Sequence, residues 1–278
     1  MSDILNRLIE KVENRYYGKY RATVTDNLDP KNLGRIKLKV PELLGDDNET
    51  GWALPCLPYG GFNESGFFFI PEINSNVWVE FEGGNLSYPI WTGTWWGESS
   101  NKNISEAKVD PDNNVKVLKT RSGHKIEFSD KDHKEKISIK SSGKHEFLLN
   151  DADGDQKIQL KSTKGHSILI DDANEKIEIT SVGGHSILID DKGKKIEIKT
   201  SNGSKISMDD SFLVLGKITI KDPAGSSIEL NGEDGSISIE SNTSLSIKGV
   251  DVTIEASGMM TVKAGGILTL QGSLIKLN

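Results

Sequence analysis

The sequence predicts an all-β chain in which a small closed barrel is followed by a long repetitive stalk. Three observations lead to this prediction: short alternating segments between turn residues before residue 97, a regular apolar repeat after residue 124, and a change of composition between them. After Trp96 the only aromatic residues are Phe128, Phe147 and Phe212. The two regions are therefore expected to differ in construction.

Residues 1–15 are predicted to form a short amphipathic helix behind a polar cap signal at Ser2 and Asp3. The apolar residues at helical spacing are Ile4, Leu5, Leu8, Ile9 and Val12. A helix of this length is marginal alone. It is expected to dock on its own barrel, on further copies of the chain, or on a separate protein.

Residues 16–97 are predicted to fold as a five-stranded barrel. Alternation and turn residues place strands at 20–25, 35–40, 52–57, 77–81 and 89–94. Asp29-Pro30, Gly60-Gly61 and Gly83-Gly84 mark turns between them. Five short strands in about 80 residues are typical of an OB-type fold. The fold alone does not establish a function.

Residues 98–118 are predicted to be a connector between the barrel and the stalk. Asn, Ser, Lys and Asp are prominent in this segment, and its residues show no periodicity. Such a composition is typical of a loop.

Residues 119–278 are predicted to form a repetitive β-helical stalk, in which each strand carries two apolar residues around one central residue, usually polar. The spacing between pairs falls from about ten or eleven residues to seven or eight. This change predicts a wide part to about residue 240 and a narrow part over 241–278. The seventeen pairs are 126/128, 137/139, 147/149, 158/160, 168/170, 177/179, 187/189, 196/198, 206/208, 218/220, 228/230, 237/239, 245/247, 252/254, 260/262, 268/270 and 275/277.

The alternation gives each strand one apolar face and one solvated face. A single layer of such strands has nothing of its own to bury against. It must either coil on itself or pack with other chains, and three chains side by side would also leave few open sheet edges. Periodicity leaves both arrangements open, and both are rods.

Composition excludes several classes of protein. The formal charge of −7 argues against sequence-independent nucleic-acid binding. No window approaches ~20 consecutive apolar residues, and the N-terminus lacks the basic-then-apolar pattern of a secretion signal. The single cysteine, Cys56, cannot form an intrachain disulfide.

The barrel segment resembles the OB domain of bacteriophage baseplate spikes and of the VgrG spikes of type VI secretion. The resemblance rests on residues 34–41 (Gly-Arg-Ile-Lys-Leu-Lys-Val-Pro), 51–55 (Gly-Trp-Ala-Leu-Pro), 70–83 (Ile-Pro-Glu-Ile-Asn-Ser-Asn-Val-Trp-Val-Glu-Phe-Glu-Gly) and 88–97 (Tyr-Pro-Ile-Trp-Thr-Gly-Thr-Trp-Trp-Gly). It implies that the stalk is a trimeric β-prism ending in a narrow β-helix. It also implies a membrane-puncturing spike of a contractile tail tube, in transient contact with the target cell envelope.

The chain departs from the family pattern in three ways, and each departure changes what the resemblance implies. Residues 98–118 are too few to hold the lysozyme domain of some spikes, so no enzymatic activity and no catalytic residue are expected. Only about fifteen residues precede the barrel, so the hub is expected to be a separate protein. The last histidine is His185, so a PAAR-type tip protein is expected instead of a tip that binds iron.

The resemblance also assigns surfaces to the partners. Contacts with the hub or between copies of the chain are expected at Ile4, Leu5, Leu8, Trp91, Trp95 and Trp96. The platform for the tip protein is expected at Leu274, Ile275, Lys276, Leu277 and Asn278. The protein would be assembled in the cytoplasm of the producing cell and become part of a phage baseplate or an injection particle.

His166 and His185 share parity with the inward apolar pairs, so in a trimer each would form a ring of three near the axis. Such a ring could hold an axial ion, but layers bonded to neighbouring serine side chains explain the histidines equally well. No cofactor is expected. The alternative function is a single-chain β-helix that binds or cleaves polysaccharide, with the barrel as a carbohydrate module. The uniformly short loops argue against it, because such sites use clustered aromatic and acidic residues on long loops.

Overall fold

The computed structural model describes residues 4, 9, 12, 14–97, 112–211 and 215–276. The chain divides into two compact units, residues 1–117 and 118–278. No helix among the described residues has the length and apolar character needed to cross a membrane.

The first unit contains a curled five-stranded sheet with the strand order β2-β1-β6-β7-β3. Its pairs are antiparallel except β3 with β7, which is parallel. Ile36 and Ala53 exchange two backbone hydrogen bonds (3.2 and 2.8 Å), which join the two ends of this strand order. The strands are β1 (Tyr20–Asp26), β2 (Lys37–Lys39), β3 (Leu54–Pro55), β6 (Asn76–Phe81) and β7 (Pro89–Thr94). The OB-like fold is therefore confirmed.

The core of the barrel comes from the inward positions of the alternating strands. Val77 and Val79 on β6 and Leu38 on β2 are completely buried. The remaining core residues are Ala22, Val24, Ile36, Val40, Ala53, Phe81 and Trp91. This unit buries a hydrophobic core of its own.

Four short elements of the first unit are absent from the sequence prediction. The helix α2 (Pro41–Leu44) follows β2, with proline at its first position, where the missing N–H costs nothing. The strands β4 (Gly60–Phe62) and β5 (Ser65–Gly66) form a hairpin where the glycines indicated only a turn. A 3-10 turn η1 (Glu82–Gly84) lies before β7. The predicted strands at 35–40 and 52–57 are shorter in the structure, and prolines stand at the ends of both.

An ion pair between Asp29 and Arg35 fixes the loop between β1 and β2. Arg35 Nη2 lies 2.5 Å from Asp29 Oδ1, and both side chains are largely buried. The Asp29 carboxylate also accepts backbone N–H groups of Lys31 (2.9 Å) and Leu33 (2.8 Å). The guanidinium of Arg35 lies over the Trp52 ring at 5.5 Å. The hydrogen bond from Arg35 and those from the backbone hold the pKa of Asp29 well below its ordinary value.

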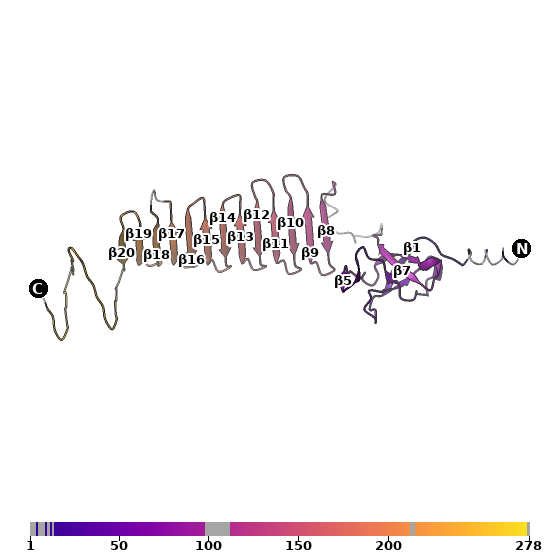
Figure 1. Ribbon diagram of the computed structural model, residues 1–278, viewed down its shortest axis with the longest axis horizontal. Coiled ribbons are helices and arrows are strands. Elements are labelled where there is room, and N and C mark those ends of the chain that lie inside the picture. The colour runs from indigo at the N-terminus through magenta and orange to yellow at the C-terminus, as the bar shows by residue number, and fades with distance from the viewer. Residues whose placement is uncertain are drawn as a thin grey trace. The chain divides into compact units, whose positions relative to one another are not determined.

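The second unit is a 13-stranded sheet in which the strands follow one another in sequence order from β8 to β20 (Figure 1). Every neighbouring pair from β9 to β20 is antiparallel. The strands are β8 (Val115–Lys119), β9 (Lys125–Ser129), β10 (Lys136–Lys140), β11 (Glu146–Asn150), β12 (Lys157–Lys161), β13 (Ser167–Asp171), β14 (Lys176–Thr180), β15 (Ser186–Asp190), β16 (Lys195–Lys199), β17 (Lys205–Asp209), β18 (Lys217–Lys221), β19 (Ser227–Asn231) and β20 (Ser236–Glu240).

Twelve of the seventeen predicted strands are confirmed, from the pair 126/128 on β9 to the pair 237/239 on β20. β8 was not predicted and lies partly within the segment expected to be a connector, because Val115 and Val117 form one more apolar pair. The rest of that connector, 98–111, lies outside the described residues.

The five strands predicted beyond residue 244 are not strands in the chain. Residues 241–276 are described throughout, and no backbone hydrogen bond joins one of them to another. Figure 1 shows this segment as a zigzag after β20. Within one chain this segment has no neighbouring strand to pair with, so its pairing in the assembled stalk stays a prediction.

The Asp29–Arg35 pair predicts a pH-dependent contribution to the stability of the barrel. Because the pKa of Asp29 is lowered on folding, the stabilisation is complete above the ordinary carboxyl pKa of 3.8 and is lost as the pH falls towards the folded value. Asp29→Asn is expected to lower the melting temperature of the barrel by several degrees at pH 7 and by much less at pH 2. The melting temperature is measured by tryptophan fluorescence during heating. Asp46→Asn, on an exposed loop, is the matched control, and an equal loss at both pH values for Asp29→Asn would contradict the account.

Candidate functional site

The largest surface without a partner in the second unit is the apolar face of the sheet. The second and fourth residues of each strand from β9 to β20 point to this face, and the registers align them in two columns. One column is Phe128, Ile137, Leu149, Ile158, Ile170, Ile177, Ile189, Ile196, Met208, Ile218, Leu230 and Ile237. The other is Ile126, Ile139, Phe147, Leu160, Ile168, Ile179, Ile187, Ile198, Ile206, Ile220, Ile228 and Ile239. We call these 24 side chains the apolar face.

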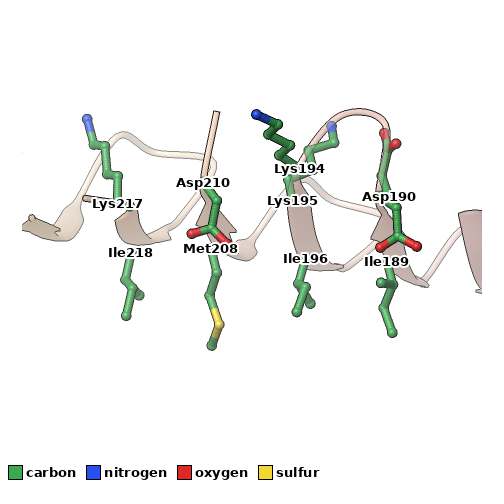
Figure 2. Close-up of a pocket in the computed structure, with 11 residues that line it drawn as sticks. Ile189, Asp190, Lys194, Lys195, Ile196, Met208, Asp210, Lys217 and Ile218 are labelled. Carbon is green, nitrogen blue, oxygen red and sulfur yellow. The ribbon is translucent and has the colours of Figure 1, made fainter. Parts of the chain in front are cut away.

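Most side chains of the apolar face are incompletely buried in one chain: Ile168 is 43 % exposed and Ile187 is 42 % exposed. Figure 2 shows how Ile189, Ile196, Met208 and Ile218 point to one side of the sheet, with Lys195 and Lys217 on the other. Full burial of such a side chain contributes about 1.5–3 kcal/mol, so covering the exposed part would add on the order of 1 kcal/mol each. A continuous exposed apolar surface of this length is typical of an interface.

Over β9–β20 the opposite face of the sheet is polar except for Leu148, Leu169 and Leu188 at central strand positions, and it carries charges of alternating sign along one side. Cross-strand neighbours there run in the order Lys157, Asp171, Lys176, Asp190, Lys195, Asp209 and Lys217. Opposite charges directly across a strand pair favour this register over a slipped one. This face suits contact with water, so the two faces of the sheet differ in the environment that they require.

The segment 241–276 continues the apolar pattern without a sheet of its own. Ile247 is 65 % exposed and Ile254 is 67 % exposed. The peptide groups in this range also have no backbone partner within the range. Buried backbone groups need hydrogen bonds, so this segment can bury its apolar residues only by pairing with other chains.

The predicted interface residues of the barrel have different environments. Trp91 is a core residue, only 4 % exposed, and its Nε1 donates a hydrogen bond to the backbone oxygen of Gly34 at 3.1 Å. Its assignment to an interface was therefore wrong. Side chains of β7 alternate between the two faces of the sheet, and this alternation points Trp91 into the barrel. Trp95 stacks on Trp78, with 5.8 Å between ring centroids, and Trp96 is 64 % exposed.

The predicted residues at the two ends of the chain are only partly described. Ile4 has helical backbone and is exposed, whereas Leu5 and Leu8 lie outside the described residues. Leu274 and Ile275 are exposed in one chain, and the platform for a tip protein stays a prediction. Lys276 is exposed as well, and Leu277 and Asn278 lie outside the described part.

Four histidines form a row along one edge of the sheet, each in the turn that precedes a strand. The Nδ1 atom of each ring accepts the backbone N–H of a residue in the next turn along that edge. The pairs are His124 with Ser142 (3.2 Å), His145 with Thr163 (3.4 Å), His166 with Val182 (3.3 Å) and His185 with Ser201 (3.3 Å). Within each turn, a Ser or Thr hydroxyl accepts the backbone N–H of the histidine. The row thus joins successive turns of the stalk to one another.

This geometry argues against His166 and His185 as metal ligands. A backbone N–H is always a donor, so the Nδ1 that accepts it carries no proton, and the neutral ring holds its proton on Nε2. Neither nitrogen then has a lone pair free for a metal. Among the described residues of one chain, no three His, Cys, Asp or Glu side chains form a group that could hold a metal ion. Sequence reasoning missed the role of the rings because their partners are backbone groups 16–18 residues away.

The histidine row predicts a contribution to the resistance of the stalk to unfolding. His166→Ala leaves the N–H of Val182 without its acceptor, and one net hydrogen bond is worth about 0.5–1.5 kcal/mol, so unfolding in guanidinium should be roughly two- to tenfold faster. His166→Asn keeps an acceptor oxygen, so its unfolding rate should lie between those of the unchanged protein and of His166→Ala. His133→Ala is the control, since His133 lies outside the row and contacts Asp153 (2.7 Å). Equal rates for the two alanine variants would contradict the proposed role.

Comparison with known proteins matches both units of the chain. Residues 20–96 match the type VI secretion system/phage-baseplate injector OB domain, and residues 176–246 match the phage baseplate V C-terminal trimerisation domain. No curated protein matches the chain. The trimerisation match covers strands β14–β20 of the apolar face and supports a homotrimer. The chain is therefore a spike protein of the phage baseplate V family, a component of contractile injection systems built from an OB domain and a trimerisation domain.

Proposed function

We propose that the protein is the homotrimeric, membrane-puncturing spike at the end of a contractile tail tube. The single observation that carries this proposal is the apolar face, which is exposed in one chain and lies partly in a trimerisation domain. Three copies packed with their apolar faces inward would form a closed rod with its charged faces in water. Such a rod has the shape and the surface that a puncturing device needs.

The contribution of this chain to puncturing is mechanical. Contraction of a sheath supplies the work, and the spike must resist unfolding and bending while it crosses the envelope. Antiparallel pairing along β9–β20 and burial of the apolar face supply that resistance. Intertwined chains in 241–276 must separate before they unfold. The resistance of the spike is therefore set by a slow rate of unfolding. No step requires catalysis by the chain.

Two partners complete the proposed assembly. A separate hub protein would bind the barrel and the N-terminal segment, where Ile4 and Trp96 are exposed. A PAAR-type tip protein would bind the end of the stalk, where Leu274 and Ile275 are exposed. In this assembly the protein is made in the cytoplasm of the producing cell and becomes part of a virion or an injection particle.

The alternative of a single-chain β-helix that acts on polysaccharide has less support. Successive strands of β8–β20 form one sheet, and no described residue of the second unit coils over the apolar face. The turns between these strands are short, and the described ones carry no cluster of aromatic and acidic residues.

The test uses particles of the system that encodes the chain, with Leu274 and Ile275 both changed to Glu. These substitutions leave the barrel and β9–β20 intact, so particles should assemble and contract as before under electron microscopy. Delivery into target cells should fall roughly tenfold or more, because apolar anchors of an interface are worth about 2 kcal/mol each.

The matched control is Thr269→Glu, which adds a charge between Leu268 and Leu270. The alternation of this segment directs the side chain of residue 269 away from the apolar side. Delivery by the control particles should stay normal. Normal delivery by the Leu274→Glu, Ile275→Glu particles would contradict the tip assignment. Normal delivery by particles that lack the whole chain would contradict the spike function.

A further inference from the structure

The β4–β5 hairpin of the barrel exposes an unusual number of aromatic side chains. We call residues 59–69 the aromatic finger. Phe62 is 76 % exposed and Phe68 is 67 % exposed, and Tyr59, Phe67 and Phe69 are about half exposed or more. The barrel is already closed and filled without these rings. The finger therefore has no role in the core of its own domain.

The finger is ordered by contacts among its own rings. Tyr59 and Phe67 meet edge to face with 6.5 Å between ring centroids, and Phe67 and Phe69 lie 6.0 Å apart. Its two strands approach at Gly60 and Gly66, where a Cβ on Gly66 would lie 2.8 Å from the Cα of Gly60. Only glycine permits this approach. The rings are thus presented in a fixed arrangement before any partner binds.

The exposed area of the finger is large enough for a specific interface. Five aromatic side chains of about 150–250 Å² each, exposed by about three fifths, leave roughly 600 Å² of ring surface in water. Specific interfaces bury about 600–1,000 Å² per partner, so the finger reaches the lower end of this range. Soluble monomers rarely expose a continuous apolar patch of this size without a functional reason. The finger needs a partner.

A complementary hollow lies on another part of the same barrel. Ile73, Trp95 and Trp96 line it together with polar residues of β6 and the end of β7, and its volume is about 420 Å³. The guanidinium of Arg21 lies over the Trp95 ring at 5.0 Å. Trp95 Nε1 is buried and has no hydrogen-bond partner in the described structure. No carboxylate among the described residues forms an ion pair with Arg21. The hollow therefore offers an apolar lining, and a cation without an ion-pair partner lies over one of its tryptophan rings.

We propose that the aromatic finger of one protomer docks in the Ile73–Trp95–Trp96 hollow of the next protomer of the trimer. Phe62 at the fingertip would enter the hollow, and Glu64, the only acidic residue of the finger, would pair with Arg21. Each barrel gives one finger and receives one, so the contact is head-to-tail and closes after three copies.

The occupant is a second copy because the stalk brings copies together. A trimerisation domain on the same chain raises the effective concentration of the neighbouring barrels to the millimolar range, so even a weak contact is formed. The finger would bury up to roughly 600 Å² of its own surface in such a contact, which is the lower limit for one partner of a specific interface. The proposal rests on the homotrimer, and light scattering on each variant reports separately whether the trimer has formed.

The test is crosslinking in the full-length protein, in a Cys56→Ser background because Cys56 is exposed. Asn63→Cys marks the fingertip and Thr94→Cys marks the hollow. With both substitutions, a short bismaleimide should link chains into covalent dimers and trimers on a denaturing gel. Each single variant should remain monomeric on the gel. A trimer in solution that gives no linked chains, or links chains through Asn63→Cys alone, would overturn the proposal.

Charge reversal separates a specific contact from mere proximity. Glu64→Arg and Arg21→Glu should each lower the yield of linked chains several-fold, and the two together should restore it. No restoration would contradict the Glu64–Arg21 pair. Rapid maleimide labelling of a Phe68→Cys trimer, together with binding to phosphatidylglycerol vesicles, would show that the finger faces solvent or lipid and would also overturn the proposal.

Discussion

The structure depends on one constraint: a single β-sheet with one apolar face cannot bury that face by itself. The two columns of the apolar face run without a break from β9 to β20, and no other part of the second unit covers them. Burial therefore has to come from other copies of the chain. The polar opposite face, with its alternating lysines and aspartates, has to remain in water. The homotrimer and the closed rod proposed above follow from this division of the sheet into two faces.

The same constraint acts differently on the two parts of the stalk. From β8 to β20 each strand finds its backbone partners within the chain, so only side chains remain for the contact between copies. Over 241–276 both backbone groups and apolar side chains lack partners within the segment. Formation of this part is therefore coupled completely to assembly. The barrel differs from both, since Val77, Val79 and the rest of its core are buried within one chain.

Local alternation made the strands of the sheet predictable. Ile-x-Ile segments between polar turns indicate strands with one buried face, and twelve of them are strands in the structure. Alternation does not say where the neighbouring strand comes from, so the narrow part forms no sheet within one chain and its pairing with other copies stays a prediction. Trp91 was misassigned because an aromatic residue near a domain end fits an interface and a core equally well. The histidine row and the aromatic finger depend on contacts between turns and on the closing of Gly60 against Gly66, which no local pattern encodes.

The measurement that tests the central claim most directly is the absolute mass of the full-length protein in solution by multi-angle light scattering. One chain has a mass of 30.5 kDa. If the apolar face is covered by two further copies, the mass will be three times this value and will not fall on dilution, because the stalk has no stable folded monomer. A folded species with the mass of one chain would contradict the account, since the apolar face would then be stable in water.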